Sequence, residues 1–243
     1  MAGGREYPPA HGPHKPKRRR GTVNYIWYQV QNMPVTEPIS KVNLERLTNG
    51  IYAFTMTLMI RNIQVPAAGA LDNPVYTVAY IGTTIGAVID FIGAFLILGM
   101  FWLFYFQMFH RMKTFDYRFL YIHLLSLMVV VFVPFTEAFT SGDGYEFTDL
   151  LFQLNYLALA VVLAYAWFYA CRARPSLLVP ELTVAEALFL QKKFLVPVGV
   201  ALLGVAILVW GLPFYDLLYL LPFAILAVFF RNPPGAGETP PAE

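Results

Sequence analysis

Hydrophobic residues gather into six long stretches along this chain, and a polar segment precedes the first of them. Each stretch is close to the roughly 20 residues that an α-helix needs to cross the hydrocarbon of a bilayer. The stretches cover residues 44–64, 80–108, 119–139, 146–170, 193–211 and 213–231. This pattern predicts an all-α, polytopic membrane protein with six transmembrane helices per subunit. One re-entrant hairpin in place of the last two spans is the alternative, because only a turn around Gly211 and Pro213 separates them.

The flanking segments divide the chain into three parts. Residues 1–40 are rich in proline, glycine, lysine and arginine, which predicts a basic and partly disordered cytoplasmic tail. Residues 41–232 form the predicted six-helix membrane domain, and residues 233–243 form a second, short cytoplasmic tail. Within the membrane domain, residues 180–191 are amphipathic and predict a separate short helix on the inner membrane surface.

Lysine and arginine alternate between the predicted loops. The first loop, residues 66–79, and the third, residues 140–145, contain neither residue type. The N-terminal segment and the second and fourth loops carry Lys17, Arg18, Arg19, Arg20, Arg111, Lys113, Arg118, Arg172, Arg174, Lys192 and Lys193. Because basic loops stay in the cytoplasm, this alternation predicts an even number of spans with both termini cytoplasmic. We expect the protein to lie in the plasma membrane.

The composition narrows the class of protein. Hydrophobic residues make up 58% of the chain and charged residues 13%, whereas about a quarter of the residues in a soluble domain are charged. The single cysteine, Cys171, excludes a disulfide framework and the usual thiolate metal site. The basic run at residues 15–20 is better explained as a tail beside the membrane than as a nucleic-acid site. The sequence contains no paired-carboxylate, nucleophile-elbow or phosphate-loop pattern, so we expect no enzyme, cofactor or bound metal. Trp102 and Trp167 are expected to anchor the chain in the headgroup region.

The first predicted helix carries a stripe of polar and small residues. At 3.6 residues per turn, six residues share one face: Asn43, Leu47, Gly50, Phe54, Thr57 and Arg61. Lipid disfavours polar side chains unless they face protein or water. The stripe therefore predicts either a seam between closely packed helices or the wall of a pore. In a pore, Phe54 would form a hydrophobic constriction, and Thr57 would offer oxygen atoms to a partly dehydrated cation.

The sequence of this helix resembles that of a known channel family. Residues 47–58 read Leu-Thr-Asn-Gly-Ile-Tyr-Ala-Phe-Thr-Met-Thr-Leu, and residues 63–66 read Ile-Gln-Val-Pro. Further similar elements follow in order at Trp102, residues 111–116 and residues 134–136. This series resembles the prokaryotic transmembrane protein 175 family of potassium channels. The first helix of that family typically reads Phe-Ser-Asp-Gly, then an Ile/Met-Thr-Leu-Leu core and then Val-Pro.

The resemblance covers residues 41–170 and implies a passive, potassium-preferring cation channel, with residues 41–232 as its channel domain. Members of the family are six-helix subunits that assemble as homotetramers, with the first helices lining a central pore. By position, Phe54 matches the hydrophobic constriction and Thr57 the threonine associated with potassium preference, while Gly50 and Arg61 share their face. The expected partners are membrane lipids and further copies of the chain, with no nucleic acid. K⁺ is the expected permeant ion.

The chain departs from the family's Arg-x-x-x-Phe-Ser-Asp motif. The matching positions, which we expect to form a scaffold, are Asn43, Leu47, Thr48 and Asn49. Both charged residues of the motif are therefore replaced by neutral amides. Loss of only one would leave an unpaired charge in a low-dielectric site, which is costly. Loss of both keeps hydrogen-bonding groups without a net charge.

Arg61 bears on conduction, because four guanidinium groups at an outer mouth would repel K⁺ unless they are neutralised. We expect its side chain to reach the outer headgroups or to pair with Asp90, Glu137 or Asp149. If Arg61 faces an open lumen, we expect the protein to be poorly cation-selective, anion-permeable or silent. The lost charge pair and the added Arg61 together motivate the alternative function, a non-conducting membrane scaffold or a small-molecule transporter that retains the fold. His123, inside the third span, is expected to be a packing residue rather than a proton sensor.

Overall fold

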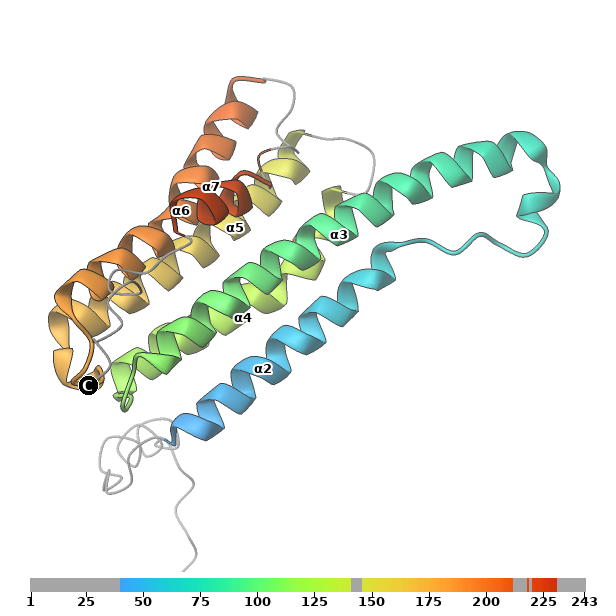
Figure 1. Cartoon of the computed structure of the whole chain (residues 1–243). Coiled ribbons are helices and arrows are strands. Elements are labelled where there is room, and N and C mark those ends of the chain that lie inside the picture. The colour runs from blue at the N-terminus through green and yellow to red at the C-terminus, as the bar shows by residue number, and fades with distance from the viewer. Residues whose placement is uncertain (1–39, 141–145, 212–217, 219, 231–243) are drawn as a thin grey trace, which may run out of the picture. The chain divides into compact units, whose positions relative to one another are not determined.

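The computed structural model describes residues 40–140, 146–211, 218 and 220–230. The described residues all belong to one compact unit. Of the predicted tails, at residues 1–40 and 233–243, all residues except Ser40 lie outside the described part. All the regular elements within the described residues are helices, as predicted for the fold class (Figure 1).

The helices follow one another in a simple order. They are α2 (Lys41–Leu58), the 3₁₀-helix η1 (Met59–Asn62), the 3₁₀-helix η2 (Ala70–Asp72), α3 (Pro74–His110), α4 (Tyr117–Thr140), α5 (Glu146–Phe168), the π-helix η3 (Tyr169–Ala173), the 3₁₀-helix η4 (Pro175–Leu177), α6 (Val184–Val209) and α7 (Leu221–Phe229).

Four of these helices are long and apolar enough to cross a membrane. They cover Pro74–His110, Tyr117–Phe139, Phe147–Ala173 and Val184–Val209. The second to fifth predicted spans are thus present as helices. α2 has 18 residues and is more polar than these four, although α2 and η1 together measure about 35 Å, enough to cross the roughly 30 Å of hydrocarbon. α7 has nine residues, and part of its predicted span lies outside the described residues, so the six-span architecture stays a prediction.

The prediction of a separate surface helix at residues 180–191 is wrong. α6 begins at Val184 and continues without a break to Val209. A capping box starts it: the Glu186 amide donates to the Thr183 hydroxyl (3.2 Å), and the Thr183 amide donates to the Glu186 carboxylate (3.2 Å). Pro197 lies inside the helix but does not end it. The amphipathic segment is therefore the first two turns of a spanning helix.

α3 begins earlier than predicted, because Asn73 and Pro74 form a helix start. The Asn73 side chain accepts a hydrogen bond from the Val75 amide (3.0 Å), and Pro74 occupies the first turn. The 37 residues of α3 extend about 55 Å. Its N-terminal turns reach beyond α4 and α5 (Figure 1), and its buried residues begin only at Ala94.

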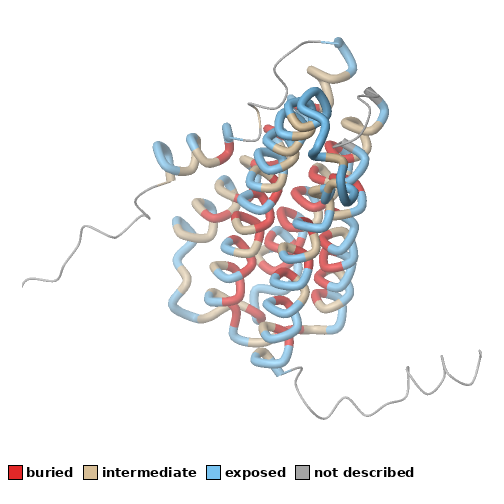
Figure 2. Tube along the Cα trace, turned by 90° about the vertical axis from the view of Figure 1, so that its right-hand side faces the viewer, coloured by how far each residue is buried: buried red, intermediate tan, exposed pale blue. Residues whose placement is uncertain are grey.

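Aromatic rings fill the core between α3, α5 and α6. Phe194 of α6 lies 5.3 Å from Phe104 of α3 and 5.7 Å from Trp167 of α5, measured between ring centroids. Trp167 is completely buried and donates its indole N–H to the Ala187 carbonyl (3.1 Å). The prediction that Trp167 anchors in the headgroups is therefore wrong. Figure 2 shows the buried residues as a band along the inward sides of the helices.

Candidate functional site

α2 has one buried face and one exposed face. The buried face consists of Leu44, Thr48, Tyr52, Thr55 and, in η1, Met59. These positions are three or four residues apart and therefore lie along one side of the helix.

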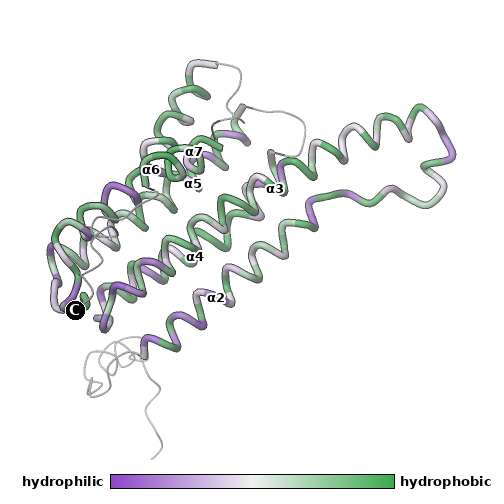
Figure 3. Tube along the Cα trace, viewed as in Figure 1, coloured by the Kyte–Doolittle hydropathy of each residue, from purple (hydrophilic) through white to green (hydrophobic). Residues whose placement is uncertain are grey.

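All six residues of the predicted stripe lie on the exposed face instead: Asn43, Leu47, Gly50, Phe54, Thr57 and Arg61. Phe54 is the most prominent of the apolar ones, with 60% of its surface exposed. Figure 3 shows hydrophilic positions at the start of α2 and again where η1 ends. No helix of the described part of the chain covers this stripe.

Polar contacts fix α2 at both of its ends. Near its start, the Lys41 ammonium donates to the Met112 carbonyl beyond α3 (2.9 Å). Where η1 ends, the Asn62 side-chain amide donates to the Pro134 carbonyl (3.2 Å) and to the Glu137 carboxylate of α4. Proline has no backbone N–H to donate. The Pro134 carbonyl is nevertheless an acceptor, and its bond with Asn62 holds the end of η1 against α4.

A buried hydrogen bond joins α2 to α4 between these ends. The Thr48 hydroxyl lies 2.7 Å from His123 Nε2 and donates to the Leu44 carbonyl (2.8 Å). The imidazole is completely buried and packs against the rings of Tyr105 (4.8 Å) and Phe109 (5.1 Å). His123 is therefore enclosed by the core, in agreement with a packing role, and it also supports Thr48 of the predicted scaffold.

The other scaffold positions lie as follows. Asn49 Oδ1 accepts a hydrogen bond from the indole N–H of Trp102 on α3 (2.8 Å), while Asn43 and Leu47 are exposed. Trp102, expected to be a headgroup anchor, thus holds α2 to α3. Sequence reasoning missed this contact, although the position of Trp102 within the family resemblance pointed to a role beyond anchoring.

Two positions on the exposed face are of interest for a pore, the Thr57 hydroxyl and the backbone at Gly50. The Thr57 hydroxyl donates its proton to the Phe54 carbonyl (2.8 Å), so its oxygen can act toward other groups only as an acceptor. No atom would lie within 4 Å of a Cβ placed on Gly50. Packing inside the subunit therefore does not require glycine here, even though glycine costs about 1 kcal/mol relative to alanine in a helix.

Arg61 is exposed at the end of the same face. The ion pairs formed among the described residues are Lys41–Glu45, Arg111–Glu186 and Arg174–Asp116. Arg61 belongs to none of them, and the amide of its neighbour Asn62 contacts Glu137 instead. No group of three His, Cys, Asp or Glu side chains that could hold a metal occurs in the described ranges.

The fold and the half-exposed first helix define a multi-pass helical membrane protein. Comparisons with known proteins show which proteins it is similar to. Residues 43–134 match the family described as endosomal/lysosomal potassium channel TMEM175. A potassium channel of Streptomyces collinus is 25% identical over 134 residues, which are 53% of this chain and 64% of that protein, so the match spans less than two thirds of the relative.

The fold is similar to that of a solved relative. The crystal structure of a lysosomal potassium-selective channel TMEM175 homolog from Chamaesiphon minutus matches with a TM-score of 0.63 at 21% identity, over 79% of this chain and 96% of that one. The family model and the relative match the same family that the sequence of the first helix resembles. All three matches are described as potassium channels, which agrees with the expectation that the chain is not an enzyme.

Proposed function

We propose that this protein is a passive, potassium-preferring cation channel whose pore lies on the axis of a homotetramer and is lined by α2. We further propose that it lies in the plasma membrane with both termini in the cytoplasm, as the alternation of basic loops predicts. The potassium preference extends to this chain what the descriptions of its relatives state of them.

The observation that carries the proposal is the exposed stripe on α2. A helix that faced lipid with Asn43, Thr57 and Arg61 would incur a cost for each polar group. The opposite face of the same helix is already occupied by contacts with α3 and α4. A water-filled axis shared by several copies satisfies the exposed polar groups without disturbing these contacts.

Two residues of the stripe have distinct proposed roles. Phe54 projects its ring into the axis, where a ring of four would form a hydrophobic constriction that excludes water. Thr57 lies about one turn further along. Because its hydroxyl proton is used within the helix, its oxygen acts as an acceptor toward a cation that has lost part of its hydration shell.

The test is a reversal-potential measurement on the purified chain in bilayers with a K⁺/Na⁺ gradient. We expect Thr57→Val, which keeps the shape and removes the oxygen, to lower the K⁺/Na⁺ permeability ratio by about tenfold if the oxygen contributes about 1.4 kcal/mol. Thr55→Val is the matched control, since Thr55 lies on the buried face of the same helix. An unchanged ratio in Thr57→Val, or an equal loss in both variants, would contradict the assignment of Thr57.

One observation favours a second candidate, a non-conducting scaffold or small-molecule transporter with the same fold. Arg61 is exposed on the stripe, outside the ion pairs formed among the described residues. On the channel proposal, Arg61→Gln should raise K⁺ conductance several-fold at low salt and less at high salt, because screening already weakens the repulsion. Conductance that stays at the level of protein-free bilayers in the parent chain, in Arg61→Gln and in Phe54→Ala would favour the scaffold instead.

A further inference from the structure

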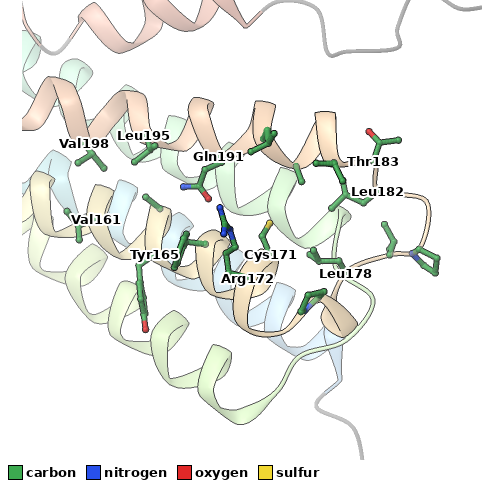
Figure 4. Close-up of a pocket in the computed structure, with 18 residues that line it drawn as sticks. Val161, Tyr165, Cys171, Arg172, Leu178, Leu182, Thr183, Gln191, Leu195 and Val198 are labelled. Atoms are coloured by element: carbon green, nitrogen blue, oxygen red, sulfur yellow. The ribbon is translucent and has the colours of Figure 1, made fainter.

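A large groove lies between α5, the connection through η3 and η4, and the first half of α6. Its volume is about 1040 Å³, and apolar side chains form most of its wall (Figure 4). Val161 of α5 and Val198 of α6 mark one end of it, and Thr183 marks the other. Tyr165 and Leu195, about half exposed, stand at its rim, so the groove opens to the surroundings of the helix bundle rather than into its core.

The part of the groove between Val161 and Arg172 matches one leaflet of a bilayer in length. The stretch of helix from Val161 to Arg172 measures about 16 Å at 1.5 Å per residue. This is close to half of the roughly 30 Å hydrocarbon thickness. Arg172 lies at the end of a predicted span, so the apolar wall runs from the level of the headgroups toward the middle of the membrane. Extended hydrocarbon is the ligand that fits such a wall.

Two polar side chains of the groove, Arg172 and Gln191, lie between its two ends. Figure 4 shows Arg172 and Gln191 facing each other across the groove from η3 and α6. The Arg172 guanidinium lies 5.9 Å from the centroid of the Phe168 ring and belongs to none of the ion pairs formed among the described residues. Its neighbour Arg174, by contrast, is paired with Asp116 (3.5 Å). Arg172 therefore presents a positive charge that the described part of the chain does not neutralise.

We propose that this groove binds one anionic phospholipid, with an acyl chain along the wall from Arg172 toward Val161 and a phosphate at Arg172 and Gln191. A guanidinium and an amide supply several N–H donors, which suit phosphate oxygens. None of the described residues lining the groove is acidic, so the choline of a zwitterionic lipid finds no partner there. Basic pockets between spanning helices are a recurring form of anionic-lipid site.

The role of the Arg172 charge in lipid binding is tested by titrating the full chain with lipid in neutral detergent. Binding is followed by native mass spectrometry. The probes are phosphatidylglycerol, phosphatidylcholine with the same acyl chains, and glycerol 3-phosphate. We expect phosphatidylglycerol to bind more tightly than phosphatidylcholine, and Arg172→Gln to weaken it by about tenfold. Lys192→Gln removes the same charge from an exposed neighbour that does not line the groove, and should leave the affinity unchanged. Thermal melting of both variants confirms that they are folded.

The role of the apolar wall in binding the acyl chain is tested with a substitution that fills the groove. Leu195→Trp should abolish phosphatidylglycerol binding, whereas Leu202→Trp, at an exposed position of the same helix outside the groove, should not. The proposal is overturned if the two lipids bind equally, if Lys192→Gln weakens binding as much as Arg172→Gln, or if glycerol 3-phosphate displaces the lipid. It is also overturned if Leu195→Trp changes only the oligomeric state, since a second copy of the chain would then cover the groove.

Discussion

Replacing Phe54 with alanine should raise potassium flux through the reconstituted protein by about tenfold, equivalent to lowering the permeation barrier by about 1.4 kcal/mol. The ring is 60% exposed in the subunit and lies on the polar face of α2. In the proposed tetrameric pore, a ring of four phenyl groups around the axis would leave too little room and too few hydrogen-bond partners for a continuous column of water. Alanine removes both restrictions. The measurement is potassium efflux from liposomes at matched protein content.

The control for this experiment is Ile60→Ala. Ile60 is also a large exposed apolar residue of the first span, with 55% of its surface exposed, but it lies off the stripe. Phe54→Leu should give an intermediate flux, because leucine is smaller than phenylalanine and still apolar. A flux in Phe54→Ala that equals that of the parent chain, or a rise of the same size in Ile60→Ala, would remove Phe54 from the pore.

Replacing Thr48 with valine should destabilise the subunit by about 1–2 kcal/mol, because it removes the hydroxyl that bonds to a buried histidine. His123 Nδ1 already has no hydrogen-bond partner among the described residues. The valine variant therefore leaves both ring nitrogens unpaired. The loss is measured as a shift of the unfolding midpoint in a denaturing-detergent titration.

The same helix supplies a matched control for this prediction. Thr55 is as buried as Thr48, but its hydroxyl lacks a hydrogen-bond partner within the described ranges. Thr55→Val should therefore be neutral or slightly stabilising. Adding His123→Phe to Thr48→Val should recover part of the lost stability, since both partners are then apolar. Equal destabilisation by the two valine variants would show that the Thr48–His123 bond contributes nothing specific.

That the stripe residues of α2 share one face could be predicted from sequence because polarity and helical period act together. Lipid disfavours polar groups, and a period of 3.6 places residues such as Gly50, Thr57 and Arg61 on one side. The structure brings them to a common exposed face. Their roles in conduction could not be settled this way, because they depend on neighbouring copies of the chain and on the path of the ion.

Other features depended on contacts that a linear pattern does not contain. Trp167 resembles an interface residue in sequence, but it is buried because Phe194 and Ala187 of α6 cover it. The start of α6 looked like a surface helix because its first turns are amphipathic, and only the capping box at Thr183 fixes where the long helix begins. The bond between Thr48 and His123 joins residues 75 positions apart. Neither residue type indicates from the sequence that the two side chains meet.

The hydrogen bonds that hold α2 to its neighbouring helices have a consequence for gating. Contacts from Lys41, Thr48, Asn49 and Asn62 hold this helix to the α3–α4 part of the subunit along its length. Rotating α2 alone would break these bonds, among them the buried Thr48–His123 bond, which water cannot replace. In a pore lined by α2, a change of diameter must therefore carry α2, α3 and α4 together. The moving surfaces would then be those between subunits, and a gating stimulus would act there rather than on the first helix itself.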